Sequence, residues 1–239
     1  MADILRIDRI LTESGIASRS EVNRAAKRGH ITCNGKVVRD LSQKVDPHTA
    51  ILCYDGERII WRESTFVMLN KPDGYISATD DPREMTVLEL LDDRLCRMGM
   101  FPCGRLDKDT LGLLILTNDG VTAHRLTSPK HHAEKIYFFR CRDPLTDEAA
   151  LRLTEGVTLD DGYHTLPCQI TREDGHMSGT ITLTEGKYHQ IKRMLSAVGN
   201  AVTYLERISF GGISLDRSLA RGAWRLLTDD EIARLKDIQ

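Results

Sequence analysis

The 239-residue sequence has few aromatic residues, almost no net charge and no long hydrophobic run. Phe, Trp and Tyr make up 5% of it, and 33 lysines and arginines stand against 35 aspartates and glutamates, a formal charge of −2. No apolar stretch approaches the roughly 18–20 residues that a membrane-spanning helix needs. The opening MADILRIDRILTESG is charged where a signal peptide needs an apolar segment. We therefore expect a cytoplasmic protein with no membrane partner.

Motifs for metals, nucleotides and disulfides are also missing. The six cysteines form no Cys-x-x-Cys pair, and no Gly-x-x-x-x-Gly-Lys-Ser/Thr sequence marks a phosphate-binding loop. The segment that begins at Asp107 has the acids and the glycine of a calcium loop at its first, third and sixth places. However, Asn118 stands at the twelfth place, where a bidentate glutamate is required. We expect reduced thiols and no metal site.

Basic residues are segregated along the chain although the total charge is near zero. Residues 19–39 contain six basic residues and one acid, and residues 121–142 contain five basic residues and one acid, with three histidines between them. A third basic group without acids consists of Lys187, Lys192 and Arg193. The compensating acids lie elsewhere, in Asp80–Asp81, Asp92–Asp93, Asp160–Asp161 and Asp229–Asp230–Glu231.

Such segregation can give a molecule of zero net charge one basic face, as binding to a phosphate backbone requires. The alternative is that each cluster is an ordinary solvated surface. Three clusters make that alternative weaker than one cluster would.

Two helices and a hairpin are predicted in the first sixty residues. The first apolar residues fit a short amphipathic helix, and Ser18 and Glu21 have the spacing of a capping box that opens a second one. Gly29 is expected to end this second helix in the left-handed conformation. Asn34-Gly35 between β-forming residues predicts a hairpin, because a type I′ turn needs positive φ at both positions. A further strand is expected to end near residue 54.

A second core is expected to begin with the strand at residues 66–69, so the predicted domains are residues 1–62 and 63–239. Beyond the boundary, strands and helices alternate without a regular βαβ period. The sequence therefore predicts the α+β class, with a mixed, mainly antiparallel sheet. Strands are expected at residues 113–117, 136–141 and 181–184, and helices are expected from Thr146 to Gly156, from Gly186 to Ala197 and after Thr228.

Three stretches carry side chains suited to chemistry. GRLDKDTLG, at residues 104–112, places two carboxylates in a glycine-bounded loop beside an apolar strand, although Asp107 alone is equally explained as a turn former. Lys135 and Tyr137 lie on one side of a strand, because side chains alternate with period two. In the predicted helix after Gly186, cations stand near the first turn, where the helix dipole favours anions. Such a cation is more easily understood if it meets a carboxylate or a phosphate.

Together these stretches resemble known sequence motifs. GRLDKDTLGLLILTNDG, TSPKHHAEKIY and EGKYHQIKRM are similar, in this order, to three motifs of the RNA pseudouridine synthases. The run MLNKPDGYISATDDP, within residues 66–82, resembles the small-subunit ribosomal RNA branch of that superfamily. The first sixty residues resemble an S4 RNA-binding domain. The resemblance covers nearly the whole chain and implies an S4-type domain followed by a catalytic domain of pseudouridine synthase type.

The resemblance implies an isomerase that converts a uridine of 16S ribosomal RNA to pseudouridine. In that reaction the glycosidic bond is cleaved, the uracil turns, and C5 rejoins C1′. Asp107 is then the essential carboxylate, and Lys192 is the candidate cation that keeps it ionised in a water-poor pocket. Tyr137 would stack on the extracted uracil. Lys192 stands where other branches often carry arginine. Lysine keeps the positive charge of arginine but lacks its bidentate geometry.

The same resemblance suggests how the substrate is held. The target base must leave its stack, so the enzyme must stabilise both the flipped base and the gap that it leaves. Arg105 is the candidate gap filler, and Leu106 and Ile191 are expected to exclude water around the base. The reaction is redox-neutral and breaks no phosphate bond, so no cofactor is implied.

The expected partner is ribosomal RNA, and a target buried in the mature small subunit would require an assembly intermediate. A basic helix and hairpin in the first domain can hold phosphates of structured RNA without reading its sequence. The predicted RNA contacts are Arg19, Arg24, Arg28, Lys36, Lys135, Lys187 and Arg193.

Two other functions stay open at this point. The enzyme could modify a uridine of 23S ribosomal RNA, because recognition of folded RNA is spread over many shape contacts. Alternatively, the chain could be a non-catalytic S4-type RNA-binding factor for ribosome assembly. The joint presence of Asp107, Tyr137 and Lys192 favours an enzyme.

Overall fold

The chain folds into two units that are discontinuous in sequence. The structure is a computed structural model that describes residues 4–238. The first unit contains the chain up to Thr65 together with Leu91–Met100, and the second contains Phe66–Leu90 and the chain from Phe101 onward. The domain boundary between residues 62 and 63 stays a prediction. The predicted first domain, residues 1–62, does not include the segment Leu91–Met100, which belongs to the first unit. Residues 1–3 and 239, the outer ends of the two predicted domains, lie outside the described residues.

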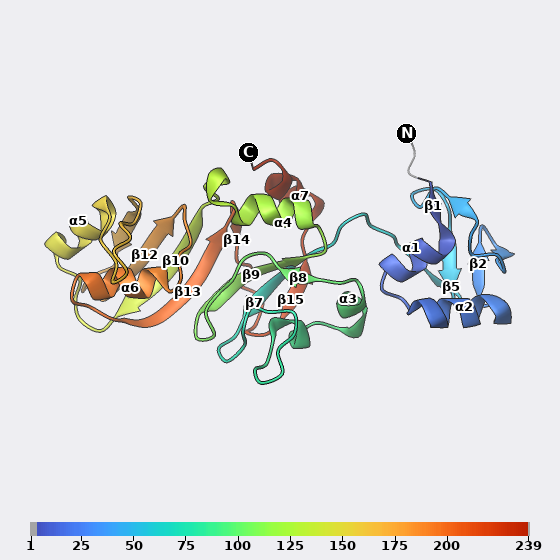
Figure 1. Ribbon diagram of the computed structural model, residues 1–239, viewed down its shortest axis with the longest axis horizontal. Coiled ribbons are helices and arrows are strands. Elements are labelled where there is room, and N and C mark those ends of the chain that lie inside the picture. Colours follow the sequence, from blue (N-terminus) through green and yellow to red (C-terminus); the bar gives the residue numbers. More distant parts are fainter. Residues whose placement is uncertain (1–3, 239) are drawn as a thin grey trace. The chain divides into compact units, whose positions relative to one another are not determined.

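Two helices pack beside a small sheet in the first unit (Figure 1). Helix α1 spans Ile7–Glu13 and α2 spans Arg19–Arg28. The predicted capping box is confirmed, because the Ser18 side chain accepts from the Glu21 amide and the Glu21 carboxylate accepts from the Ser18 amide. Gly29 ends α2 with φ 79°, also as predicted.

The sheet of this unit confirms the predicted hairpin. Asn34 and Gly35 take φ values of 50° and 78° in the turn between its first two strands. The strand order is β3-β2-β5-β6, and β1 pairs with β4 in a separate ribbon. The strands are β1 (Leu5–Arg6), β2 (Ile31–Cys33), β3 (Lys36–Val37), β4 (Lys44–Val45), β5 (Leu52–Tyr54) and β6 (Glu57–Arg58). Strands β1, β4 and β6 were not predicted, because two residues are too few for an alternating pattern.

Helix α3 (Asp93–Arg97) belongs to the first unit although it follows the 3-10 helix Val87–Leu90 of the second unit in the chain. Arg94 Nε donates to the Ser14 carbonyl at 3.0 Å, and Arg97 Nε donates to the Gly15 carbonyl at 2.8 Å. Gly15 has φ 69°, and a Cβ at this position would lie 2.3 Å from the Arg94 carbonyl oxygen. Only glycine fits this close contact.

A nine-stranded sheet forms the second unit, in the order β11-β12-β10-β13-β9-β7-β15, with β14 beside β13 and β8 beside β9. Among the described strands, only β13 and β9 pair in parallel, so the predicted mixed, mainly antiparallel α+β fold is confirmed. The strands are β7 (Phe66–Lys71), β8 (Phe101–Pro102), β9 (Leu111–Thr117), β10 (Lys135–Cys141), β11 (Gln169–Arg172), β12 (Ser178–Leu183), β13 (Val202–Phe210), β14 (Ile213–Ser214) and β15 (Trp224–Leu226).

Helices cover this sheet at two places and create two cores (Figure 1). Helices α5 (Asp147–Glu155) and α6 (Gln190–Ala197) pack on β10, β12 and β13, whereas α4 (Gly120–Thr127) and α7 (Asp229–Lys236) pack over β7 and β9. The first core includes Phe139, Leu153, Ile181, Met194 and Leu205, and the second includes Phe66, Leu113, Ile115, Leu126 and Leu235. Two 3-10 helices, Val87–Leu90 and Pro129–His131, complete the elements.

The helix predicted to follow Gly186 begins later than expected, at Gln190. Lys187 therefore lies before the helix, whereas Lys192 and Arg193 lie in its first turn. The reason is His189, which adopts φ 48° and ψ 35°, a left-handed conformation that does not continue an α-helix.

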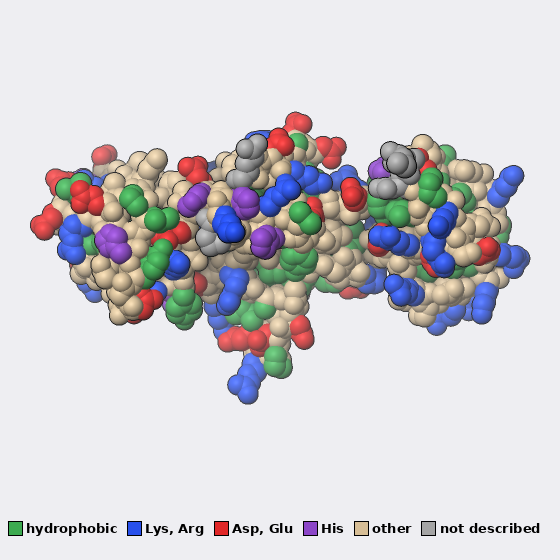
Figure 2. All heavy atoms as spheres, turned by 45° about the horizontal axis from the view of Figure 1, so that its top comes forward, with side chains coloured by type: hydrophobic (Ala, Val, Ile, Leu, Met, Phe, Trp, Pro, Cys, Tyr) green, Lys and Arg blue, Asp and Glu red, His purple; other side chains and the backbone are tan. Residues whose placement is uncertain are grey.

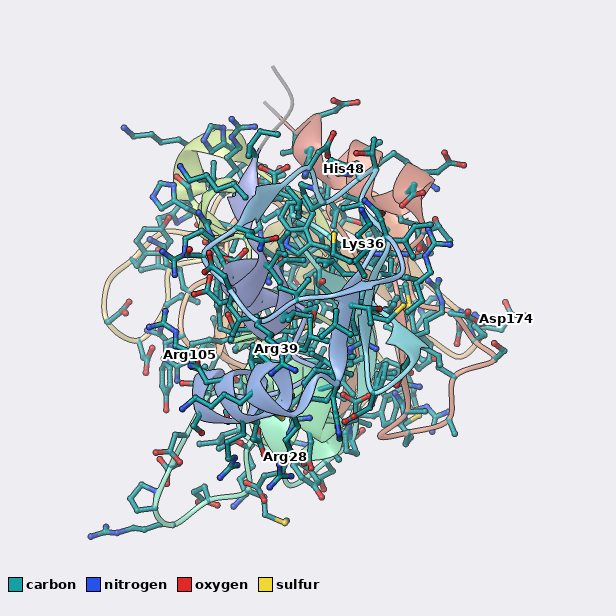
Figure 3. The ribbon with its side chains drawn as sticks, turned by 90° about the vertical axis from the view of Figure 1, so that its right-hand side faces the viewer. Arg28, Lys36, Arg39, His48, Arg105 and Asp174 are labelled. Atoms are coloured by element: carbon teal, nitrogen blue, oxygen red, sulfur yellow. The ribbon has the colours of Figure 1, made fainter. Side chains whose placement is uncertain are left out.

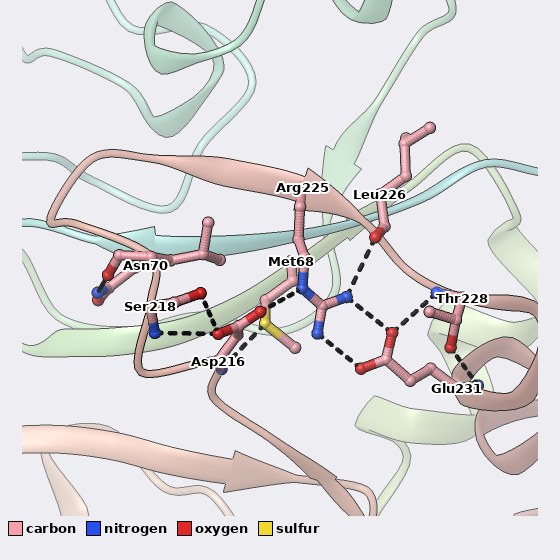
Figure 4. A network of polar contacts seen from close by, with 9 residues as sticks. Met68, Asn70, Asp216, Ser218, Arg225, Leu226, Thr228 and Glu231 are labelled. Atoms are coloured by element: carbon pink, nitrogen blue, oxygen red, sulfur yellow. Dashed lines mark hydrogen bonds and ion pairs between the residues drawn. The ribbon is translucent and has the colours of Figure 1, made fainter.

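A polar network fixes the end of the second unit (Figure 4). Arg225 on β15 donates from Nε to Asp216 at 2.9 Å and from both terminal nitrogens to the Glu231 carboxylate at 2.8 Å. Glu231 also completes the capping box predicted for α7, with Thr228 as the N-cap. Hydrogen bonds from Arg225 to Glu231, and from Ser218 and Arg225 to Asp216, lower the pKa of each carboxyl to about 2.

Candidate active site

Asp107 lies in the loop between β8 and β9, with 26% of its side chain exposed. A turn holds the loop, because the Thr110 amide donates to the Asp107 carbonyl at 3.0 Å. On the other side, Ser77 Oγ accepts from the Leu106 amide and donates to the Leu106 carbonyl, both at 3.0 Å. At its end, Gly112 has φ 96°, and a Cβ there would lie 2.3 Å from the Arg207 carbonyl oxygen of β13. The loop is therefore fixed at both ends.

Lys71 holds the Asp107 loop through hydrogen bonds to its backbone carbonyls. Our sequence analysis assigned this residue no role. Its side chain is fully buried at the end of β7, and its Nζ donates to the carbonyls of Lys108 and Thr110, both at 2.9 Å, and of Pro72 at 3.0 Å. The two loop carbonyls flank Asp109 and lie just beyond Asp107 in the chain. Burial lowers the pKa of Lys71 to about 8, although nearby carboxylates, Asp73 first, oppose the shift. The only signal in the sequence is its place in the MLNKPDG run.

Helix α6 brings Lys192 to this loop. The start of the helix is fixed by Gln190, whose Oε1 accepts from the Lys187 amide at 2.8 Å and whose Nε2 donates to buried Glu185 at 2.7 Å. Ile191 and Met194 pack into the core, which leaves Lys192 on the side of the helix that meets the Asp107 loop.

Lys192 contacts two carboxylates. Its Nζ lies 3.0 Å from Asp107 Oδ2 and 2.6 Å from Asp109 Oδ1, and 25% of its side chain is exposed. Burial alone would lower the pKa of Lys192, but the bonds to Asp109 and Asp107 outweigh it and raise the pKa. Burial likewise opposes ionisation of Asp109, yet the bond from Lys192 lowers the pKa of that carboxyl. One ammonium is therefore shared between the two carboxylates.

A histidine also borders Asp107, which sequence reasoning missed. His189 Nε2 lies 3.6 Å from Asp107 Oδ1, and its imidazole stacks on the ring of Tyr188. The histidine stands inside the EGKYHQIKRM motif, but no periodicity argument singles it out, because its left-handed backbone directs the ring.

Tyr137 and Ile191 lie on the core beside this cluster. Tyr137 packs against the core that contains Ile191 and is half-buried. In the sheet it pairs with Arg207 of β13, which in turn pairs with Gly112 at the end of the Asp107 loop. Tyr137 is therefore in the same row of the sheet as the base of that loop, two strands away.

Arg105 and Leu106 precede Asp107 and have different surroundings. Leu106 is buried. Arg105 is exposed and lines a cavity of about 510 Å³, together with Ser77, Thr79, Phe101, Gly104, His124 and Thr127. The structure thus places a cation and a cavity at the rim of the Asp107 loop. The roles of both residues stay predictions.

In the first unit, the four predicted RNA contacts are all exposed. Arg19, Arg24 and Arg28 lie on α2, and Lys36 lies on β3. Figure 3 looks onto this unit and shows Arg28 and Lys36 at its surface. Within the described chain, none of the four forms an ion pair with a carboxylate.

The predicted RNA contacts of the second unit have internal partners. Lys135 is half-buried and donates to the Ala133 carbonyl at 2.7 Å, and Lys187 Nζ lies 4.2 Å above the Tyr163 ring. Arg193 is ion-paired with Asp160 and Asp161, the latter at 2.7 Å. Asp160 and Asp161, which lie elsewhere in the sequence, are therefore next to the third basic cluster in the fold. A loop returns this acidic pair to α6, which sequence distance does not reveal.

A further basic surface surrounds α4. Figure 2 shows histidine and basic side chains gathered on this face of the second unit. They come from α4, the 3-10 helix that follows and the residue after that helix, and the exposed ones are His124, Arg125, Lys130 and His132. This face adjoins the cavity at Arg105, because His124 lines it.

Comparison with known proteins defines the class of protein to which this chain belongs. Residues 65–197 match the RNA pseudouridylate synthase family, and residues 5–51 match the S4 domain. The chain therefore belongs to the RNA pseudouridine synthases, which are isomerases, and carries an N-terminal S4 domain. The family resemblance predicted from the motifs is confirmed.

Individual relatives match along nearly the whole chain. An uncharacterized RNA pseudouridine synthase, YtzG, of Bacillus subtilis is 44% identical over 98% of this chain and 100% of the relative. Ribosomal small subunit pseudouridine synthase A of Escherichia coli K12 is 38% identical over 96% of this chain and 99% of the relative. A crystal structure of a pseudouridylate synthase matches with a TM-score of 0.68 and 35% identity, covering 97% of this chain and 99% of that one.

Residues 4–238 contain no candidate for a membrane-spanning helix or for a metal site. No helix in this range is long and apolar enough to cross a membrane. No group of three or more histidine, cysteine, aspartate or glutamate side chains in it is arranged to hold a metal ion.

Proposed function

We propose that this chain converts a uridine of small-subunit ribosomal RNA to pseudouridine, with Asp107 as the essential carboxylate. The observation that carries the proposal is the contact of Asp107 with Lys192, at 3.0 Å, in a loop fixed by Ser77 and Lys71. The choice of RNA is supported by the full-length likeness to ribosomal small subunit pseudouridine synthase A.

The reaction moves one bond and one proton. The N1–C1′ glycosidic bond breaks, the uracil turns, C5 bonds to C1′, and the hydrogen on C5 leaves while N1 gains one. Asp107 acts on the sugar, either as a nucleophile or by stabilising and deprotonating a ribose intermediate. Lys192 places a positive charge 3.0 Å from this carboxylate in a half-buried site, where it would stabilise negative charge on the group that acts on the sugar.

The residues around the carboxylate would hold the flipped base. Tyr137 supplies a ring for stacking, and Leu106 and Ile191 supply apolar surface that excludes water. Taking a base out of its helix costs a few kcal/mol, so the remaining gap must also be stabilised. Arg105 would do this, and its exposed position at the rim of the Asp107 loop beside a cavity supports the assignment.

The first unit would hold structured RNA around the target. Its exposed cations, Arg19, Arg24, Arg28 and Lys36, suit phosphates, which position an RNA without reading its sequence. We assign this task to residues 1–62 and catalysis to residues 63–239. The substrate in this proposal is a small-subunit assembly intermediate in the cytoplasm, and the reaction uses no cofactor.

Tritium release tests the proposal. Purified chain is incubated with transcripts of small-subunit or large-subunit ribosomal RNA labelled with tritium at uridine C5, since forming the C5–C1′ bond releases that tritium. We expect release from the small-subunit transcript, no detectable release by Asp107→Asn, and RNA binding by this variant within a few-fold of wild type.

The matched control is Asp109→Asn, which removes the other carboxylate bound by Lys192 and is expected to keep measurable turnover. Unchanged turnover by Asp107→Asn would contradict the proposal. Release from the large-subunit transcript alone would reassign the substrate. Release from neither transcript, nor from small-subunit assembly intermediates that carry the same label, would favour a non-catalytic RNA-binding factor.

A further inference from the structure

Tyr188 is an exposed aromatic residue at the edge of the candidate active site. Its relative exposure is 74%, and no other aromatic residue is found among the exposed large hydrophobic residues of the described chain. One face of its ring is covered by the His189 imidazole, with ring centroids 3.8 Å apart and planes 18° from parallel. Because a single stack covers one face, the high exposure leaves the other face open to solvent.

The backbone fixes this pair of rings in place. His189 adopts the left-handed conformation at the N-terminus of α6, where φ is 48° and ψ is 35°. The Tyr188 carbonyl accepts from Arg193 Nη1 at 3.3 Å, and the Lys187 amide donates to Gln190 Oε1 at 2.8 Å. The rings are therefore presented by a turn tied to the buried end of α6.

The pair borders the reacting carboxylate. The edge of the His189 ring carries Nε2, which lies 3.6 Å from Asp107 Oδ1, while its face carries Tyr188. Tyr188 is thus separated from Asp107 by a single ring, that of His189. A nucleotide whose sugar is held at Asp107 has its neighbours in the RNA chain within reach of such a ring.

An open aromatic ring beside a base-flipping site has a specific use. When a base leaves its stack, its neighbour in the strand loses a stacking partner. Aromatic side chains bind unpaired bases by stacking, independently of sequence, because every base has a π-face. The face-to-face arrangement of Tyr188 and His189 already has the geometry of such a stack, and a nucleobase on the open face would extend it to three rings.

We propose that Tyr188, backed by His189, is a stacking platform for an unpaired nucleobase next to the uridine that is isomerised. This subsite rests on the proposed function, because it takes its occupant from an RNA bound at Asp107. A single ring flanked by polar and charged residues is far smaller than a protein–protein interface, which needs about 1,000 Å². Tyr188 acts in positioning the RNA and takes no part in the chemical step.

The test combines turnover with a direct measure of stacking. Tritium release from the small-subunit transcript gives KM and kcat, and a single-stranded oligouridylate with one 2-aminopurine reports stacking by fluorescence quenching. The full-length chain is compared with Tyr188→Ala, Tyr188→Leu and Tyr188→Phe. Leu151→Ala is the control, because it removes another exposed apolar side chain, at 59% relative exposure, from α5.

We expect Tyr188→Ala and Tyr188→Leu to raise KM at least roughly 5-fold, with kcat within two-fold of wild type and with quenching lost, because a base stack is removed. Tyr188→Phe keeps the ring and is expected to restore both KM and quenching. Leu151→Ala is expected to match wild type, and the Tm of every variant should stay within about 2 °C.

Three results would overturn the platform. The first is an unchanged KM and unchanged quenching in Tyr188→Ala. The second is a fall in kcat at unchanged KM, which would mean that Tyr188 acts on Asp107 through His189. The third is a Tyr188→Phe variant as defective as Tyr188→Ala. Absence of tritium release by wild type would refute the proposed function instead, and the quenching experiment would still decide whether the ring stacks a base.

Discussion

The basic residues of α2 and α6 look alike in sequence but differ in their surroundings. On α2, Arg19, Arg24 and Arg28 are exposed and, within the described chain, form no ion pair. On α6, Lys192 binds Asp107 and Asp109, and Arg193 binds Asp160 and Asp161. A cluster of basic residues in a sequence can therefore be either an exposed surface without ion pairs or a set of partners for the protein's own carboxylates. Acidic residues brought to the cluster by distant loops decide which of the two it is.

The difference has a functional consequence. Cations without internal carboxylates remain available to the phosphates of a bound RNA, and their contribution to binding falls with salt. Cations that hold the protein's own carboxylates set the charge and the position of those groups. We therefore assign α2 to RNA binding and Lys192 to catalysis, and the following changes test that division.

The largest effect is expected when the ammonium at the active site is removed. In Lys192→Met, Asp107 and Asp109 lose their shared counter-ion, so we expect kcat to fall roughly 10²- to 10³-fold, the scale of losing one electrostatic group at an active site. Lys192→Arg keeps the charge and is expected to recover part of the loss. Tritium release measures kcat for both variants. An unchanged kcat in Lys192→Met would contradict the assignment of Lys192 to catalysis.

Neutralising α2 should affect binding rather than chemistry. For Arg19→Gln/Arg24→Gln/Arg28→Gln we expect KM for RNA to rise at least roughly 10-fold at unchanged kcat. The salt dependence of binding should weaken by about 2–3 units of slope, since each lost phosphate contact accounts for about 0.9. Arg6→Gln is the control in the same unit, because Asp8 already holds that guanidinium. A lower kcat with an unchanged salt slope would contradict the assignment.

Lys71 is a third kind of cation, buried and bound to carbonyls, and it should make activity depend on pH. Its pKa is about 8, below the ordinary 10.5, so the folded chain releases this proton earlier than the unfolded chain does. Between pH 8 and 10.5 this group therefore makes folding more favourable as pH rises, while the ammonium that holds the Asp107 loop is lost.

We accordingly expect kcat to decline above about pH 8 without a fall in Tm attributable to this group. The charged groups that face the Lys71 ammonium are Asp73, Asp107, Asp109 and Lys192. Lys135, whose pKa burial also lowers to about 8, is the control: Lys71→Met should remove the inflection, whereas Lys135→Met should keep it. An inflection that survives in Lys71→Met would contradict this role.

The smallest effect is expected at Arg225, which binds two carboxylates away from the active site. Arg225→Gln should lower the Tm by roughly 4–8 °C, since charged hydrogen bonds contribute about 2 kcal/mol and this size of domain loses about 2–4 °C per kcal/mol. Arg234→Gln, an exposed arginine on α7, should change Tm little. Turnover at low temperature should be unchanged in both variants.

The pH dependence of that network has the opposite sign from that of Lys71. The pKa values of Asp216 and Glu231 are about 2, below their ordinary 3.8 and 4.5, so their stabilising contribution is complete above about pH 4.5. It is lost as the pH falls toward 2, because the carboxyls then take up protons in the folded state. A wild-type Tm that stays constant from pH 5 to pH 2 would contradict this account.

Contacts between residues close together in the chain could be predicted from the sequence. The capping boxes of Ser18 with Glu21 and of Thr228 with Glu231, and the Asn34-Gly35 turn, depend on residues no more than three apart, so their spacing is visible in the sequence. The α+β class followed from the same local patterns.

Contacts between distant segments were not predictable. The carbonyls bound by Lys71 lie 37 and 39 residues away, and a backbone carbonyl has no signature in a sequence. The same holds for the return of Asp160 to Arg193 and for the left-handed turn that brings His189 to Asp107. The pairing of Asp107 with Lys192 was inferred only from family resemblance, and residue pattern alone left Asp107 indistinguishable from a turn carboxylate.

The central claim is that Asp107 of this chain isomerises a uridine of small-subunit ribosomal RNA. Carbodiimide mapping of pseudouridines in that RNA tests it most directly, in cells without the gene and in the same cells supplied with wild type or Asp107→Asn. The account predicts that one pseudouridine disappears with the gene, returns with wild type and does not return with Asp107→Asn. A full set of pseudouridines in cells without the gene, or recovery with Asp107→Asn, would contradict it.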